Sequence, residues 1–176
     1  MEKAIKTMRE LISKLEIRCV GDVFTAHLPH STVEIAALMN SAPAVFLSKI
    51  LPVQSIEVSN EEARLGRLLS PADIEGCLSF DAEREFGEAS EENRDLVRNR
   101  LIPIFLDCDG SPACISSGDD WMHSRILLLQ KGHVFETNDP DERVKEAQLL
   151  PVALGDFFDY LIAFRGEGSL AEDEPL

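Results

Sequence analysis

The chain has 176 residues, 44% of them hydrophobic, and this length and composition predict one domain whose core needs no disulfides. Its 32 acidic and 17 basic residues give a net charge of −15, which disfavours nucleic acid as a partner. No apolar run reaches the ~20 residues of a membrane helix, no signal-peptide pattern opens the sequence and the four cysteines are widely spaced. We therefore expect a cytoplasmic protein with reduced thiols and no membrane contact.

The charge is distributed unevenly along the chain. Residues 1–20 hold five bases and three acids, residues 57–95 hold twelve acids and four bases, and residues 101–176 hold fifteen acids and five bases. An acidic surface of this kind steers a basic partner towards the protein. It is equally consistent with a protein that is acidic for solubility alone.

The first predicted element is an amphipathic helix over residues 2–16. Its apolar stripe consists of Ile5, Met8, Ile12 and Leu15, at steps of three, four and three, and we expect this stripe to pack on a sheet. Residues 18–27 read as a loop or a short strand leading to Leu28-Pro29.

Two capping patterns predict the next helices. Ser31 followed three residues later by Glu34 is a capping box, which starts a helix that extends to about residue 40. Residues 44–58 read as a short helix followed by a strand. Ser70-Pro71 starts another helix, expected to bury Ile74, Cys77 and Leu78. The charge-dense residues 81–95 read as a surface insert or a loosely packed helix.

Residues 101–137 carry three consecutive strand and turn signals and predict a four-strand antiparallel meander. The apolar run 101–106 is followed by Asp109-Gly110, the dipeptide of tight hairpin turns, and by a returning strand over residues 113–116. A polar loop over residues 117–120 leads to a strand at 125–129, and Lys131-Gly132 turns it into a strand at 133–137.

The last elements are a short helix over residues 141–149 and a strongly amphipathic helix over residues 154–165. The apolar positions of the second helix recur at helical spacing: Leu154, Phe157, Phe158, Leu161 and Ile162. Gly166 ends it, and residues 167–176 form an acidic tail that we expect to be disordered. The predicted fold class is thus α+β, with a twisted antiparallel sheet flanked by N-terminal and C-terminal amphipathic helices, in one domain over residues 1–166.

Several of these signals, in this order, resemble the SUKH superfamily, which includes many bacterial immunity proteins. The matching signals are Leu28-Pro29 and Asn40 ten residues later, the helix from Ser70, the strand entry Leu101-Ile102-Pro103-Ile104, Asp109-Gly110, Gly132-His133-Val134, and the helix with Phe157, Phe158 and Leu161. The resemblance implies an antiparallel sheet with flanking helices and no catalytic activity. It also implies a protein that binds and neutralises a cognate toxin, often a nuclease.

Two carboxylates, Asp107 and Asp109, flank Cys108 before Gly110. This run is similar to the start of a calcium loop, but the third oxygen ligand and the Glu at the twelfth position of the loop are missing. A hairpin turn is the better interpretation.

Other chemistry has little support in the sequence. Cys108, Cys114, His123 and His133 could meet around zinc, yet no pair has the short spacing of a structural site. No Ser stands in a nucleophile elbow and no phosphate-binding Gly-rich loop occurs. Cys19 and Cys108 have no basic setting that would activate a thiolate. We therefore predict no catalytic residue, no cofactor and no metal.

Trp121, the only tryptophan, follows Asp119 and Asp120 in a loop. An apolar anchor among charges is typical of a binding hot spot, and also typical of a core tryptophan that closes the end of a sheet. Glu83 and Glu85 belong to a group of acids that is most simply a solvated face and would steer a basic toxin. The predicted partner-binding residues are Asp107, Asp109, Asp119, Asp120, Trp121, Glu83 and Glu85.

Three functional hypotheses follow. The first is a cytoplasmic immunity protein that binds a basic protein toxin. The second is an intracellular scaffold or regulator of the same fold with no toxin partner. The third is an enzyme or metal-binding protein, which metal analysis and the Cys114→Ser and His123→Ala variants would test.

Overall fold

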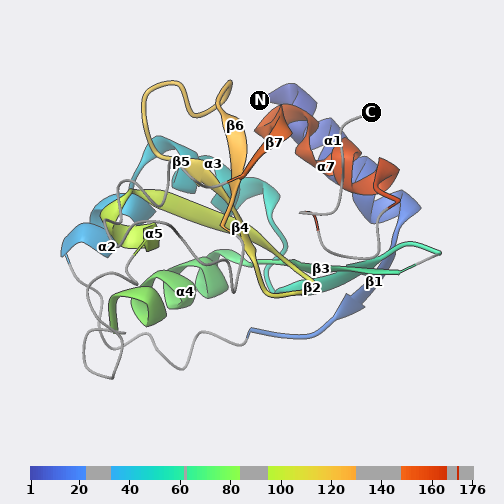
Figure 1. Cartoon of the computed structure of the whole chain (residues 1–176), viewed down its shortest axis with the longest axis horizontal. Coiled ribbons are helices and arrows are strands. Elements are labelled where there is room, and N and C mark those ends of the chain that lie inside the picture. The colour runs from blue at the N-terminus through green and yellow to red at the C-terminus, as the bar shows by residue number, and fades with distance from the viewer. Residues whose placement is uncertain (23–32, 62, 84–94, 130–147, 166–169, 171–176) are drawn as a thin grey trace.

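The computed structural model describes residues 1–22, 33–61, 63–83, 95–129, 148–165 and 170. The helices in these ranges are α1 Glu2–Lys14, α2 Val33–Met39, α3 Ala42–Ile50, α4 Pro71–Glu83, α5 Asp95–Arg98 and α7 Leu154–Ala163. The strands are β1 Glu16–Cys19, β2 Ile56–Ser59, β3 Arg64–Leu68, β4 Leu101–Asp107, β5 Pro112–Ser116, β6 Arg125–Leu128 and β7 Gln148–Ala153. Figure 1 shows their arrangement.

The strands form one seven-stranded antiparallel sheet in which spatial order equals chain order, from β1 to β7. The predicted α+β class, with an antiparallel sheet and flanking helices, is confirmed. Strands β4, β5 and β6 match the predicted meander, whereas the strand expected at 133–137 lies outside the described residues. The position beside β6 belongs to β7, so the helix predicted over residues 141–149 is wrong at its C-terminal end.

The β4–β5 hairpin forms as the Asp109-Gly110 signal predicts. Gly110 has φ 82°, a backbone conformation that glycine adopts at no steric cost, and its N–H donates to the Asp107 carbonyl at 2.9 Å. Pro103 lies inside β4, next to an irregularity in the β4–β5 register. A proline has no N–H to give to a ladder, and a bulge is where a strand interior accepts one.

Strand β3 was not predicted, because its sequence Arg-Leu-Gly-Arg-Leu has neither alternation nor β-branched residues. Gly66 explains how β3 can pair with β4. Its φ is 150°, and a Cβ at this position would overlap with the Leu106 carbonyl oxygen on β4. The glycine therefore allows the β3 and β4 backbones to approach each other closely.

Helix α7 covers the sheet with the apolar face that the sequence predicts. Phe157 and Phe158 are fully buried, and Phe157 makes an edge contact with Phe105 of β4 at a centroid distance of 6.0 Å. Leu154 and Leu161 on the same face are also fully buried, whereas Ile162 is half-buried.

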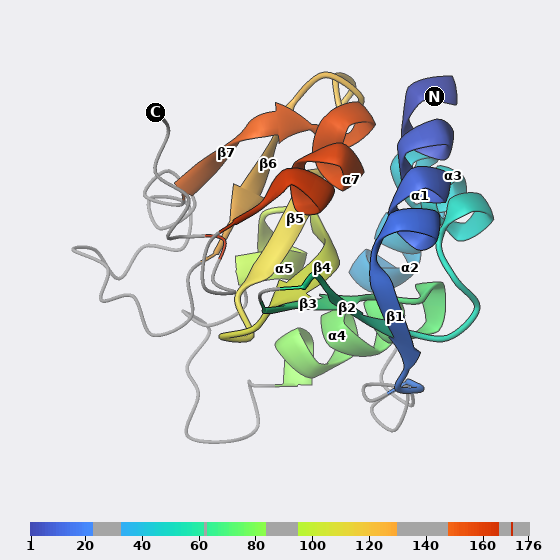
Figure 2. The ribbon, with the colours of Figure 1, turned by 90° about the vertical axis from the view of Figure 1, so that its right-hand side faces the viewer.

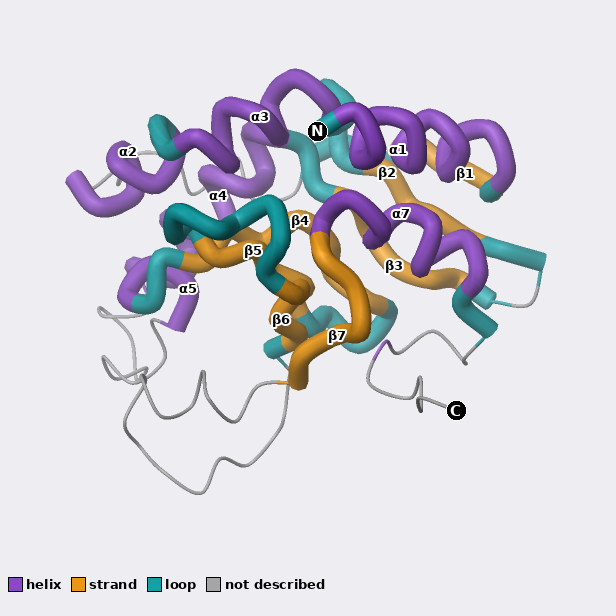
Figure 3. Tube along the Cα trace, turned by 90° about the horizontal axis from the view of Figure 1, so that it is seen from above, coloured by secondary structure: helices purple, strands orange, loops and turns teal. Residues whose placement is uncertain are grey.

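Helix α1 packs side by side with α7, as Figures 1 and 2 show. Its buried residues are Ala4, Thr7, Met8 and Leu11. The predicted stripe is thus rotated, since Ile12 is 48% exposed. The two helices approach each other closely at this point, because the Thr7 hydroxyl donates to the Gly155 carbonyl at 3.1 Å. Seen from above in Figure 3, both helices lie over β1 to β3.

Helices α2 to α5 contact one another, and α4 and α5 also contact β4. The predicted burial of Ile74, Cys77 and Leu78 on α4 is confirmed. Ser31, which should cap α2, lies outside the described residues. Within the described part of the chain, no single helix is long and apolar enough to span a membrane, and only α2 and α3 taken together, bent by 59°, reach that length and composition.

Candidate functional site

The β5–β6 loop, residues 117–124, is a chain of hydrogen-bonded turns. Trp121 donates its N–H to the Gly118 carbonyl at 3.2 Å, and His123 donates to the Asp120 carbonyl at 3.1 Å. Ser124 donates to that same carbonyl twice, from its N–H at 3.0 Å and from its hydroxyl at 2.8 Å. These bonds fix the loop backbone without a partner molecule.

Trp121 anchors this loop to the body of the protein. The indole is half-buried, and its ring lies 5.5 Å from the ring of Phe46 on α3 at an angle of 45°. This is the arrangement of a tryptophan that closes the edge of the core. Of the two interpretations that the sequence left open, core closure agrees better with the structure.

Asp119 and Asp120, which precede the tryptophan, are both exposed. Beside Asp119 lies a shallow groove of about 330 Å³, lined by residues of the turn before β4 and of the loop: Asn99, Arg100, Ser116, Ser117, Gly118 and Asp119. Arg100 and Ser117 join the two walls, because the Arg100 Nε donates to the Ser117 hydroxyl at 3.3 Å and the Ser117 N–H donates to the Arg100 carbonyl at 3.1 Å. The loop therefore presents two carboxylates on a fixed frame.

Asp107 does not belong to this surface, which corrects its predicted role in partner binding. The side chain is 3% exposed, and its Oδ1 accepts hydrogen bonds from the N–H groups of Asp109 at 3.0 Å and Ser111 at 2.9 Å. Its Oδ2 accepts a third, from Leu170 at 3.2 Å. Burial raises the pKa of Asp107, and the three N–H donors lower it in part. The carboxylate therefore holds the hairpin and the Leu170 backbone rather than a partner.

The remaining predicted acids are not brought together with the loop. Asp109 is exposed, but it lies at the β4–β5 turn, at the other end of β5 from Asp119. Glu83 is the last residue of α4, where only the backbone is described, and Glu85 lies outside the described residues. The structure thus supports one compact group, Asp119 and Asp120, with Trp121 behind it.

The cysteines and histidines do not gather into a site within the described part of the chain. There, no three His, Cys, Asp or Glu side chains come close enough to hold a metal ion. Cys114 is buried in β5, whereas His123 is exposed on the loop, and His133 lies outside the described residues. Cys19 is exposed, and its thiol donates to the Gln54 side chain at 3.2 Å.

A network of two aspartates and two serines was missed from the sequence; Ser55, Ser70 and Asp73 are buried in it and Asp22 is half-buried. The Asp73 N–H donates to the Ser70 hydroxyl at 3.0 Å, as expected for an N-cap serine, while the Asp73 carboxylate accepts a hydrogen bond from Ser55. The Ser55 hydroxyl accepts from the Ser70 N–H at 3.0 Å and donates to Asp73 Oδ2 at 2.6 Å. Asp22 Oδ1 accepts from the Ser70 hydroxyl at 2.6 Å and from the Ser55 N–H at 3.1 Å.

This network ties β2 and the segment after β1 to the start of α4. Only Ser70 and the acid at Asp73 were visible in the sequence, as a helix-start signal. The relay through Ser55 brings together residues 15 and 18 positions apart, which no local pattern reveals. Its hydroxyls and carboxylates satisfy one another, so its role is to hold the helix start.

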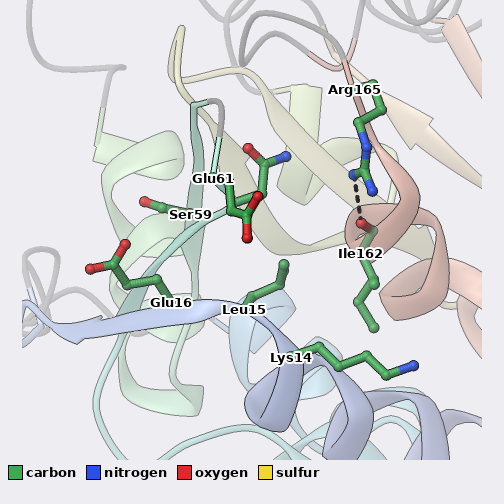
Figure 4. A pocket seen from close by; sticks show the side chains of 8 residues that line it. Lys14, Leu15, Glu16, Ser59, Glu61, Ile162 and Arg165 are labelled. Carbon is green, nitrogen blue, oxygen red and sulfur yellow. Dashed lines mark hydrogen bonds between the residues drawn. The ribbon is translucent and has the colours of Figure 1, made fainter.

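A second cavity, of about 410 Å³, opens where the C-terminal ends of α1 and α7 meet the β2–β3 turn (Figure 4). Its apolar residues are Leu15 and Ile162, with Lys14 and Arg165 on the helix side and Glu16 and Glu61 on the strand side. Asn60 closes one end of it, because its side-chain amide donates to the Phe164 carbonyl at 3.0 Å. The two basic and two acidic side chains of the lining give it no net charge.

Comparisons with known proteins gave no relative for this chain: no family model, no curated protein and no solved structure matches it.

Proposed function

We propose that this protein is a non-enzymatic, cytoplasmic binding protein of the immunity type, which neutralises a basic protein toxin by covering its active site. The single observation that carries the proposal is the β5–β6 loop, where Asp119 and Asp120 stand exposed on a backbone fixed by four hydrogen bonds and anchored by Trp121. The resemblance of the sequence to the SUKH superfamily points to the same class of function.

A fixed acidic loop suits this task for two reasons. Carboxylates on a framework that is already ordered lose little conformational freedom on binding, so more of the contact energy appears as affinity. The net charge of −15 attracts a basic domain over a longer distance and speeds the encounter. We therefore expect a one-to-one complex that forms rapidly and shows no turnover.

The test is to co-express the chain with the toxin encoded beside its gene, and to measure protection of the cells and the kinetics of the purified pair. Asp119→Asn combined with Asp120→Asn should lower the association rate constant about three- to tenfold at low salt and flatten its salt dependence, with little change in the dissociation rate constant. The matched control is Glu2→Gln combined with Glu61→Gln, which removes two exposed negative charges elsewhere. The proposal fails if no protection and no complex is found, or if both double variants behave alike.

A scaffold that binds an acidic partner is the second candidate, and a separate surface favours it. Arg18, Glu57 and Arg67 form a cross-strand row on β1, β2 and β3, and Arg64 contacts Glu57 with an Nε to Oε2 distance of 3.3 Å. These three arginines outnumber the two nearby glutamates, Glu57 and Glu16, and form a small local positive area on an acidic protein. The test is affinity capture from the native cell with wild type and with the double variant Arg64→Gln and Arg67→Gln. If the protein is a scaffold, the double variant should lose acidic partners; if it is an immunity protein, the double variant should still bind its toxin.

A further inference from the structure

Strand β1 is one edge of the sheet. It pairs with β2 on one side only, and no described strand pairs with its other side. An open edge presents unpaired N–H and C=O groups, to which another strand can add. The composition of β1, Glu-Ile-Arg-Cys, then decides which strand fits there.

The hydrogen bonds of the neighbouring residues show which backbone groups face the open edge. Val20 donates its N–H to the Ser55 carbonyl at 3.3 Å, in the same register as the β1–β2 pair. Since hydrogen-bonded pairs alternate along an antiparallel ladder, Arg18 also faces β2. The N–H and C=O groups of Ile17 and Cys19 therefore point outwards, together with the C=O of Leu15, whose N–H is bound to Leu11 at 3.0 Å.

Side chains on this strand alternate between charged and apolar. Glu16 and Arg18 are exposed on one face, and neither forms an ion pair within the described residues. Leu15 and Ile17 are half-buried on the other face, where Ile17 lies opposite the buried Val58. A partner strand thus needs a base opposite Glu16, an acid opposite Arg18 and an apolar residue between them.

We propose that the occupant of this edge is β1 of a second copy of the chain. In an antiparallel pair with Ile17 opposite Ile17 of the second copy, Glu16 faces Arg18 of the second copy and Arg18 faces its Glu16. The outward backbone groups also match this register: Ile17 pairs with Ile17 in both directions, and the Cys19 N–H meets the Leu15 carbonyl on each side. The two sheets become one continuous sheet across a two-fold axis.

This contact is short, and its affinity should be modest. The backbone hydrogen bonds, the Glu–Arg pairs and one small apolar contact lie well below a standard interface, so we expect a dimer with a dissociation constant in the micromolar range or weaker. Each copy carries −15 overall, and long-range repulsion opposes dimerisation. At about 0.15 M salt the Debye length is about 8 Å, which screens this repulsion more than the direct Glu–Arg contacts.

Disulfide trapping tests the register. In the proposed dimer the two Ile17 Cα atoms are about 5.5 Å apart, within the range of a disulfide, so Ile17→Cys in a Cys19→Ser background should cross-link readily under mild oxidation. The two native Cys19 residues would be roughly 14 Å apart, too far to cross-link. Val53→Cys in the same background is the control for random collision, because Val53 is 89% exposed and lies outside the strand.

Charge exchange tests the Glu16–Arg18 contacts of the proposed dimer and leaves Ile17 unchanged. Glu16→Arg alone, or Arg18→Glu alone, turns two attractive pairs into two repulsive ones and should weaken dimerisation about thirtyfold in sedimentation equilibrium. The double variant Glu16→Arg with Arg18→Glu exchanges the charges and should restore the wild-type dissociation constant. Glu61→Arg changes the net charge as much as Glu16→Arg does and should weaken dimerisation less than about threefold.

The proposal is wrong if Ile17→Cys cross-links no faster than Val53→Cys. It is also wrong if the double charge exchange dimerises as weakly as the single variants, or if wild type remains monomeric at millimolar concentration. A further result would also overturn it: purified wild type stays monomeric, and it captures a different protein that the Arg18→Glu variant does not capture.

Discussion

Acidic side chains serve two different purposes in two regions of this molecule. Asp73 at the start of α4 and Asp107 at the β4–β5 turn are buried, and each holds backbone or hydroxyl groups in place. Asp119 and Asp120 on the β5–β6 loop are exposed, and within the described residues the loop is held by backbone and serine groups instead of their carboxylates. All four acids lie within three residues of a Ser or Gly, so local sequence does not separate the two classes.

The difference shows that position relative to distant chain segments decides the role of an acid. A carboxylate that receives N–H or O–H donors from other elements becomes part of the frame, and its removal leaves those donors unsatisfied. A carboxylate that points into water contributes little to stability and remains available for a partner. Substitutions at these sites, in order of decreasing effect on stability, test this division.

The largest effect is expected for Asp73→Ala. The change leaves the Ser55 hydroxyl without its acceptor inside the core and weakens the start of α4, so the free energy of unfolding should fall by about 2–4 kcal/mol. Urea denaturation followed by circular dichroism would measure it. Asp73→Asn keeps an acceptor oxygen and should cost less than half as much, whereas equal losses for both variants would contradict the relay through Ser55.

Asp107→Asn should have a smaller effect that depends on pH. At neutral pH we expect a loss of about 1–2 kcal/mol, because the amide nitrogen cannot accept the Leu170 N–H. The pKa of Asp107 is raised above 3.8 by burial, so the folded state binds this proton more tightly than the unfolded state does.

The sign of the pH dependence follows from that proton. The stability of wild type relative to the variant should be greatest below pH 3.8, fall as the pH rises through the raised pKa, and stay constant above it. Denaturation of both proteins over a pH series would show this. A difference that rises with pH would contradict the assigned shift.

The smallest effect on stability is expected for Asp119→Asn and Asp120→Asn. Both side chains are exposed, and the loop is held by backbone groups of residues 118 and 120, so the free energy of unfolding should change by less than about 0.5 kcal/mol. Melting curves of the single variants beside Trp121→Ala would test this, because loss of the Phe46 contact should cost about 1–2 kcal/mol. A larger loss for either Asn variant would show that its carboxylate stabilises the fold.

Much of the fold could be predicted because it rests on local patterns. The β4–β5 hairpin has its turn dipeptide and an apolar strand, α4 has its Ser70-Pro71 start, and the buried face of α7 repeats at helical spacing. Each of these signals lies within about ten residues of the chain.

The errors share one physical cause, which is that a distant segment overrides the local pattern. Gly66 makes β3 possible through its close approach to Leu106, and packing against α7 buries the Thr7 face of α1 instead of Ile12. Leu170, in the stretch expected to be a disordered tail, is buried and bonds to Asp107. The candidate site shows the same effect. Asp119 and Asp120 are exposed, whereas Asp107, predicted to bind a partner, is buried by contacts with Leu170 and the hairpin.

The pairing of α1 with α7 has a consequence for synthesis on the ribosome. Helix α1 is complete once Lys14 has been added to the chain, and α7, which packs against it, begins only at Leu154. At about 5–20 residues per second, the ribosome needs roughly seven to thirty seconds to make the intervening chain. During that interval Met8 and Leu11 lack their final cover, so nascent chains should bind a holding chaperone through α1 and release it only after α7 has been made.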